Sequence, residues 1–220
     1  SSYDFISKAC LKILKAINLM KKNIDDITIS ILGDNFKLDK TRIAHWERFV
    51  PYLNNDDFFK NYFYINKLTK GSDSLSKRIR FWSMHQTASR IIEKFPDYNV
   101  AECGCFNGCS TYIIAKILEK NNFKNDFYIF DSFEGISKPT FEDLDYKERF
   151  PKEGIFKADE EKFTNFFKEY EFIDIKKGWI PERFKEIEEK KFSFVNIDVD
   201  IYEPTKKSLE FFFPRLVKGG

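Results

Sequence analysis

The side chains best placed to do chemistry are two aspartates, Asp198 and Asp200, which directly follow an apolar segment at residues 192–197. In an extended chain, residues i and i+2 point to the same side, so the two carboxylates converge. Converging carboxylates repel one another, and either a bound cation or a proton on one of them relieves the repulsion. A hard divalent cation such as Mg²⁺ suits carboxylate oxygens. The plainer alternative is a pair of strand-end acids that face water.

A glycine-containing turn follows a second apolar segment, residues 99–103. It reads Glu-Cys-Gly-Cys-Phe-Asn-Gly-Cys-Ser, from Glu102 to Ser110. Gly104 permits a tight turn and a close approach of the backbone to a ligand, and Gly108 lets the next helix pack against the strand. Ser110 is the expected N-cap of that helix. The carboxylate of Glu102 disfavours a diphosphate and suits an amino-bearing ligand, such as the methionyl ammonium of S-adenosylmethionine.

An acidic residue also ends the next predicted strand, since Asp131 directly follows residues 127–130. In nucleotide-binding α/β folds, an acid about 20 residues beyond the glycine turn accepts hydrogen bonds from the ribose hydroxyls. The order of glycine turn, helix, strand and acid therefore predicts a nucleoside-containing cofactor. Without Asp131, the glycines would indicate no more than an ordinary strand-to-helix turn.

Three cysteines, Cys103, Cys105 and Cys109, lie within the glycine turn. As zinc ligands they would lack the usual paired spacing and a nearby fourth ligand, because the two histidines are His45 and His85. We interpret them as small side chains of a crowded turn and as reduced thiols of a cytoplasmic protein.

Strand-like and helix-like segments alternate from residue 97 onward, which indicates an α/β fold with a mainly parallel sheet and helices on both faces. The expected strands are residues 99–103, 127–130, 172–175 and 192–197. The expected helices are residues 110–119, 160–170, 181–189 and 205–216. Ligands of such sheets bind beyond the carboxyl ends of the strands, which is where the polar residues described above lie.

The first part of the chain differs in character and is expected to form a mostly helical N-terminal region, residues 1–72, before an α/β domain, residues 73–220. The expected elements are an amphipathic helix at 4–22, a strand at 27–32, a turn at 33–34, helical pieces at 41–70 and a helix at 73–94. We expect the N-terminal region either to cover the substrate mouth or to mediate oligomerisation.

The charge pattern argues against a nucleic-acid partner. The 37 basic and 35 acidic residues give a net charge of +2 and are interleaved along the chain, whereas nucleic-acid-binding proteins concentrate basic residues on one face. No apolar run reaches the roughly 18 residues that a transmembrane helix needs, and the N-terminus lacks a signal-peptide pattern. We therefore expect a cytoplasmic protein without membrane insertion.

Three motifs resemble those of the macrocin O-methyltransferase family: Glu-Cys-Gly-x-x-x-Gly-x-Ser at 102–110, Phe-Asp-Ser-Phe-Glu-Gly at 130–135 and Ile-Asp-Val-Asp-Ile-Tyr-Glu-Pro-Thr at 197–205. The resemblance covers residues 80–220 and implies a Rossmann-like class I methyltransferase fold. It also implies an enzyme that depends on S-adenosylmethionine and Mg²⁺ and methylates a sugar hydroxyl of a small-molecule or glycan acceptor.

The resemblance further assigns roles to individual residues. The methionyl part of the cofactor would be surrounded by Glu102, Gly104, Gly108 and Ser110, the ribose by Asp131, Ser132 and Phe133, and the adenine by Gly178, Trp179 and Ile180. Asp198 would be a metal ligand and Asp200 the general base. Residues 153–156, with Asp159, would border the cofactor as a lid.

In the family, the pair Gly219-Gly220 leads into a fifth strand that ends in two further aspartate ligands. The sequence ends at Gly220, so we expect an unfinished sheet edge and an incomplete metal site. Two other functions stay open: a methyltransferase-like interaction module without turnover, with residues 1–70 as its partner surface, and a nicotinamide-dependent oxidoreductase. Glu102 and the aspartate pair count against the oxidoreductase. The sequence identifies neither the acceptor nor the oligomeric state, and a homo-oligomer stays open.

Overall fold

The computed structural model describes residues 27–31, 34–38, 56–144 and 151–220 of the chain. The chain forms two compact units, Ser1–Asn55 and Asp56–Gly220. The sequence placed its division later, between residues 72 and 73. The boundary of the compact units lies earlier because α3 (Asp56–Leu68) packs against α4 and α5 of the second unit.

In the first unit, β1 (Ile27–Ile31) and β2 (Asp34–Leu38) form an antiparallel pair in which Ile27 lies opposite Leu38. The strand expected at 27–32 is therefore present, whereas β2 was not predicted. Asp34 was expected in a turn and instead begins β2. The helix expected at 4–22 and the part of the 41–70 segment before residue 56 lie outside the described residues.

The second unit contains a four-stranded parallel sheet with the strand order β5-β4-β3-β6. Its strands are β3 (Asn99–Cys103), β4 (Phe127–Asp131), β5 (Ile173–Lys177) and β6 (Phe192–Ile197). The chain adds β4 and β5 on one side of β3 and then returns to place β6 on the other side. Open parallel sheets bind ligands at such a reversal of strand order, beyond the carboxyl ends of the strands. The parallel sheet predicted from the sequence is confirmed.

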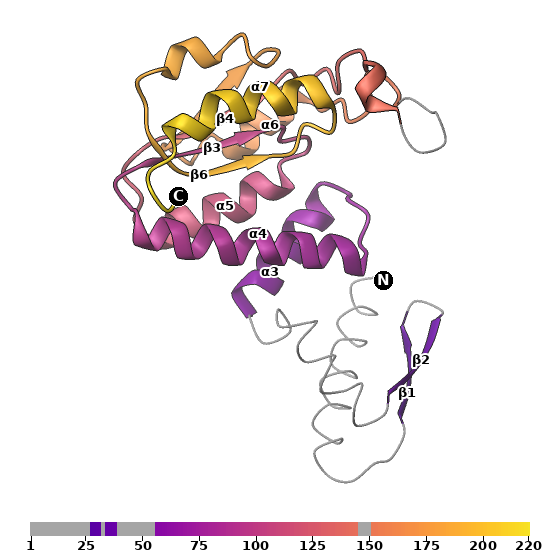
Figure 1. Ribbon diagram of the computed structural model, residues 1–220. Helices are drawn as coiled ribbons and strands as arrows, with labels where there is room; N and C mark the ends of the chain where they lie inside the picture. Colours follow the sequence, from indigo (N-terminus) through magenta and orange to yellow (C-terminus); the bar gives the residue numbers. More distant parts are fainter. Residues whose placement is uncertain (1–26, 32–33, 39–55, 145–150) are drawn as a thin grey trace. The chain divides into compact units, whose positions relative to one another are not determined.

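Helices cover both faces of this sheet, as predicted. In addition to α3, the helices are α4 (Leu75–Lys94), α5 (Cys109–Lys120), α6 (Glu160–Phe167) and α7 (Tyr202–Phe212). α4 and α5 lie on one face of the sheet and α7 lies on the other (Figure 1). α6 lies beside α5, where the rings of Phe166 and Tyr112 are in contact, with centroids 5.8 Å apart.

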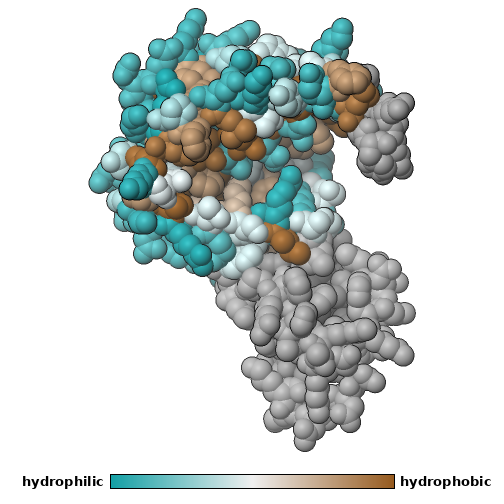
Figure 2. All heavy atoms as spheres, in the orientation of Figure 1, coloured by the Kyte–Doolittle hydropathy of each residue, from teal (hydrophilic) through white to brown (hydrophobic). Residues whose placement is uncertain are grey.

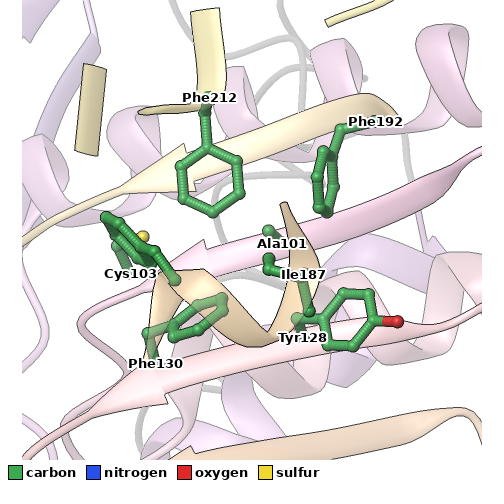
Figure 3. Close-up of a cluster of buried hydrophobic side chains, with 8 residues drawn as sticks. Ala101, Cys103, Tyr128, Phe130, Ile187, Phe192 and Phe212 are labelled. Carbon is green, nitrogen blue, oxygen red and sulfur yellow. The ribbon is translucent and has the colours of Figure 1, made fainter. Parts of the chain in front are cut away.

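A cluster of buried side chains holds α7 against the sheet (Figure 3). The ring of Phe212 in α7 lies 5.0 Å from that of Phe192 in β6 and 6.0 Å from that of Phe130 in β4, between centroids. Burial of each such ring contributes about 1.5–3 kcal/mol. Cys103 of β3 belongs to the same cluster. Since strand residues alternate between faces, the neighbouring Glu102 points to the opposite face, toward α5.

Some helices are shorter than predicted. α6 ends three residues before the expected end at 170. The segment 181–189 was expected to be a helix but contains a 3₁₀ turn at Phe184–Ile187. The side chains of Phe184 and Ile187 are both buried. α7 begins three residues before the helix expected at 205–216 and ends four residues earlier, where a 3₁₀ turn contains Pro214. Proline lacks the N–H that an α-helix would need there.

Most of the surface of the second unit that Figure 2 shows is polar. No helix in the described part of the chain is long and apolar enough to cross a membrane. Figure 2 shows hydrophobic residues gathered around α7 and β6. The exposed apolar side chains of this region include Leu209 and Phe213. β6 is the edge strand of the described sheet, with β3 as its neighbour.

Candidate active site

A cavity of about 340 Å³ lies at the carboxyl ends of the four parallel strands. Its walls come from the turns after β3, β4, β5 and β6, from α4 and from the segment that follows β4. The volume lies within the roughly 300–1,000 Å³ typical of small-molecule sites. Most of the predicted site residues line it: Gly104, Ser110, Asp131, Ser132, Gly178, Trp179, Ile180, Asp198 and Asp200. The other predicted site residues, Glu102, Gly108 and Phe133, do not line it.

Gly104 is required where two strand ends approach each other. Its φ is +82°, in the left-handed region, and a Cβ at this position would lie 2.2 Å from the carbonyl oxygen of Asp198. The Gly104 N–H donates to the carbonyl of Phe130 at 2.8 Å, and the Asp198 N–H donates to the carbonyl of Cys103 at 2.9 Å. Gly104 therefore brings the backbone close to the end of β6 as well as to the cavity.

The start of α5 differs from the prediction. Gly108, with φ +81°, is the N-cap residue, and the helix begins at Cys109. Ser110, the predicted N-cap, lies within the first turn instead, because the left-handed Gly108 already provides the change of direction. A Cβ on Gly108 would lie 2.6 Å from the ring of Phe167 in α6. Gly108 thus makes room for helix packing, and Ser110 faces the cavity.

Glu102 was predicted to contact the cofactor, but its side chain is fully buried between β3, α5 and β6. Its carboxylate accepts hydrogen bonds from the Thr111 hydroxyl at 2.5 Å and from the Asn196 amide at 2.9 Å. Burial raises the pKa of Glu102 to about 7, although these hydrogen bonds and one from Ser110 oppose the shift. Glu102 therefore joins three elements beneath the cavity and does not line it.

Asp131 lines the cavity and also holds two turns in place. Its Oδ2 accepts hydrogen bonds from the backbone N–H groups of Cys105 at 2.8 Å and Phe106 at 3.2 Å. Its Oδ1 accepts one from Phe133 at 2.7 Å. The Gly178 N–H donates to the Asp131 carbonyl at 3.0 Å, so the turn after β5 is joined to the same residue. These contacts fix the orientation of the Asp131 carboxylate at the edge of the cavity.

The acid pair follows β6, which lies on the other side of β3 from β4 and Asp131. The carboxylate of Asp198 is 3.5 Å from the guanidinium of Arg80, a residue of α4 that the sequence did not single out. Asp200 has φ +63°, a conformation that is unfavourable for residues with a side chain. Partial burial, and then the charge of Asp198, raise the pKa of Asp200, while Arg80 works against this shift. A carboxylate with a raised pKa is better suited to act as a general base.

The residues that the structure describes do not form a complete Mg²⁺ site. Among them, no group of three His, Cys, Asp or Glu side chains is arranged to hold a metal ion. Asp198, the predicted ligand, is paired with Arg80 instead. The described residues therefore supply no complete set of ligands for a divalent cation.

Two aromatic residues line the cavity near the turn after β3. The rings of Phe106 and Phe156 meet edge to face, with centroids 5.4 Å apart, and both residues have positive φ. Within the segment 153–156, predicted to border the cofactor, Phe156 lines the cavity. Asp159 instead caps α6 by accepting a hydrogen bond from the Lys162 N–H. Phe133 is buried and packs against the ring of Phe163 rather than facing the cavity.

The wall formed by α4 was missed by the sequence analysis. Lys77, Arg80 and Phe81 line the cavity, although they precede the glycine turn by more than 20 residues. Their sequence signal is weak, because charged residues spread along a helix usually form a solvent-exposed face. The neighbouring loop residues Gly71 and Ser72 also line the cavity.

Comparisons with known proteins show the family and the fold of the chain. The macrocin O-methyltransferase (TylF) family matches residues 70–220. No curated protein matches the sequence. Among solved structures, the O-methyltransferase NovP aligns with a TM-score of 0.50 and 19% identity over 62% of this chain. The chain spans 60% of the NovP chain, and at this identity the likeness shows the fold.

Two structures of CalS11 also align. One is described as a calicheamicin methyltransferase and has a TM-score of 0.49 with 18% identity, covering 76% of each chain. The other is an apo structure, described as a TDP-rhamnose 3'-O-methyltransferase of calicheamicin biosynthesis. It has a TM-score of 0.44 and 17% identity, again over 76% of each chain.

Proposed function

Because the chain belongs to the macrocin O-methyltransferase family, we propose that it transfers a methyl group from S-adenosylmethionine to a hydroxyl group of a sugar. One observation carries this proposal: a single cavity is lined both by Asp131, the acid of the expected donor site, and by the pair Asp198 and Asp200. Methyl transfer needs donor and acceptor side by side with their reacting atoms aligned. A shared cavity meets this need.

On the donor side, we assign the ribose to Asp131 and Ser132 and the adenine to the turn of Gly178, Trp179 and Ile180. Asp131 accepts three backbone hydrogen bonds, but a carboxylate has about four acceptor sites, so it can also accept one from a ribose hydroxyl. The methionyl group would then extend toward the turn after β3. Glu102 supports that turn from below instead of contacting the donor.

On the acceptor side, the sulfonium of the donor is already activated, so the protein has to align sulfur, methyl and oxygen. The methyl group moves from sulfur to the acceptor oxygen, the sulfonium becomes a thioether, and the hydroxyl proton goes to Asp200. The raised pKa of Asp200 supports this role. No step is assigned to Mg²⁺, because Asp198 is paired with Arg80 and the described residues offer no complete ligand set.

Calorimetry with S-adenosylhomocysteine tests the donor half of the proposal. The parent protein is expected to bind, and Asp131→Ala is expected to weaken binding at least tenfold, about 1.4 kcal/mol. Asp97→Ala is the matched control, since Asp97 is exposed and lies outside the cavity. Absence of binding by the parent protein would contradict the proposal.

Methyl transfer from S-adenosylmethionine to TDP-rhamnose, the substrate in the description of one CalS11 structure, is the first assay of the acceptor half. Methylated sugar in the product mixture supports the proposal. Donor binding without transfer to this or other nucleotide sugars would favour the interaction module that the sequence left open.

A further inference from the structure

The first turn of α7 follows directly after the acid loop, residues 198–201, and its N-cap residue is Ile201. An isoleucine side chain cannot accept a hydrogen bond from the free N–H groups that begin a helix. Asp143, 59 residues earlier in the sequence, supplies the acceptor: the Tyr202 N–H donates to its Oδ1 at 2.7 Å. The start of α7 is thus capped by a distant segment of the chain.

The second oxygen of Asp143 holds its own segment. Oδ2 accepts hydrogen bonds from the Thr140 N–H at 2.7 Å and from the Thr140 hydroxyl at 3.2 Å, which closes the 3₁₀ turn Phe141–Asp143. Slight burial favours the neutral acid, but the donors from Thr140 and Tyr202 outweigh it and lower the pKa of Asp143. The carboxylate is therefore charged at neutral pH, which suits the start of a helix.

Both ends of this connection adjoin the cavity. Ile136 and Ser137, shortly before Thr140, line the cavity. The acid loop that precedes Tyr202 lines it as well. The segment after β4 is also fixed farther back, because Ile136 exchanges backbone hydrogen bonds of 3.0 Å with Gly154 and Ile155. The bond between Asp143 and Tyr202 therefore ties one wall of the cavity to another.

Asp200 lies two residues before Tyr202 and has φ +63°. Aspartate adopts this left-handed conformation more readily than most residues with a side chain, and the conformation persists where the surroundings hold it. We propose that Asp143 is a positioning residue, which holds the acid loop 198–201 against the wall at 136–137 so that Asp200 faces the acceptor hydroxyl. The catalytic consequence rests on the proposed function, whereas the connection itself does not.

Hydrogen exchange of the whole chain, with and without S-adenosylhomocysteine, tests this inference. Asp143→Asn is expected to speed exchange at least fivefold in peptides covering 198–206 and 136–144, because one amide oxygen cannot accept from both Tyr202 and Thr140. Peptides covering β3 and β4 should exchange as in the parent. Glu203→Gln is the matched control, since it removes a negative charge from the exposed residue that follows Tyr202. Thr140→Val should give a smaller change in the same peptides.

A kinetic measurement distinguishes a positioning role of Asp143 from a general effect on the stability of the protein. With S-adenosylmethionine and TDP-rhamnose, Asp143→Asn is expected to lower kcat at least fivefold and to leave the KM for the donor within twofold. Unchanged exchange at 198–206, an equal effect of Glu203→Gln, or faster exchange throughout the chain would each overturn the inference. Failure of the parent to bind S-adenosylhomocysteine would instead overturn the proposed function, and the exchange comparison would still stand.

Discussion

The turn after β4 and the loop after β6 present aspartates to the same cavity but hold them differently. Asp131, after β4, accepts three backbone N–H groups from adjoining turns. Asp198, after β6, faces Arg80 at 3.5 Å in a pair whose side chains are both about half exposed. Asp200 has a positive φ, and the helix after it is capped by Asp143. Backbone N–H groups therefore fix Asp131, whereas side chains from other elements hold the loop after β6.

The difference indicates how the two halves of the site can change. Backbone donors are already oriented by the sheet, so a ligand that binds there needs little reorganisation of the protein. An exposed ion pair contributes only about 0–1 kcal/mol, so the loop after β6 is held more weakly. We therefore expect substitutions near β4 to change donor affinity and substitutions near β6 to change turnover.

The largest effect is expected where the two regions meet. Gly104→Ala places a methyl group 2.2 Å from the Asp198 carbonyl at φ +82°, and should reduce the free energy of unfolding by more than about 3 kcal/mol. Gly154→Ala is the matched control, because its φ is +74° but the nearest atom is 3.8 Å away. Gly154→Ala should reduce the free energy of unfolding by only about 1 kcal/mol. Urea unfolding measures both, and equal losses would mean that the close approach of β6 is unimportant.

Removal of the base should separate turnover from donor binding. Asp200→Asn keeps the size of the side chain and is expected to lower kcat at least 100-fold, because positioned general bases contribute about 10²–10⁴-fold. The affinity for S-adenosylhomocysteine should stay within twofold, since the donor contacts lie after β3, β4 and β5. Methylation rates with a nucleotide sugar that the unsubstituted protein accepts, together with calorimetry, test this. Retained turnover would exclude Asp200 as the base.

The buried side chain of Glu102 should make the stability of the protein depend on pH. Folding raises the pKa of Glu102 from 4.5 to about 7, so the folded state binds more protons than the unfolded state between these values. The contribution of Glu102 to stability is therefore present below about pH 4.5 and lost as the pH rises through about 7. Glu102→Gln should remove this loss. The free energy of unfolding of the variant, relative to that of the parent, should therefore be higher at pH 8 than at pH 5, by at most about 3 kcal/mol. Thermal unfolding of both proteins at the two pH values measures the difference, and parallel curves would contradict it.

The smallest effect concerns the exposed ion pair on the acceptor side. The charge of Arg80 lowers the pKa of Asp200, so Arg80→Gln should raise that pKa further and move the acid limb of the kcat profile to higher pH. The shift should be less than about one pH unit, because exposed charges are screened by water. Lys94→Gln, on the same helix but outside the cavity, is the control. A shift to lower pH would contradict the assignment.

Much of the fold could be predicted because it depends on local patterns. Buried parallel strands are short apolar runs, so β3 and β6 were located at their observed bounds. The helix expected at 73–94 was observed at Leu75–Lys94, with Ser74 as its N-cap. The 3₁₀ turns at 184–187 and 213–215 were missed, since proline and tertiary packing decide between one turn and several.

By itself, the sequence determined which strand ends carry acids and glycines, because residue order along a parallel sheet places those ends at one edge. Tertiary structure decided which of these side chains reach the cavity. Glu102 faces the helix side of β3, and Gly108 serves the packing of α6. Arg80 contacts Asp198 across 118 residues of sequence. Asp143 contacts Tyr202, directly after the acid loop, across 59 residues. Such contacts follow from how helices and loops pack, and no local pattern encodes them.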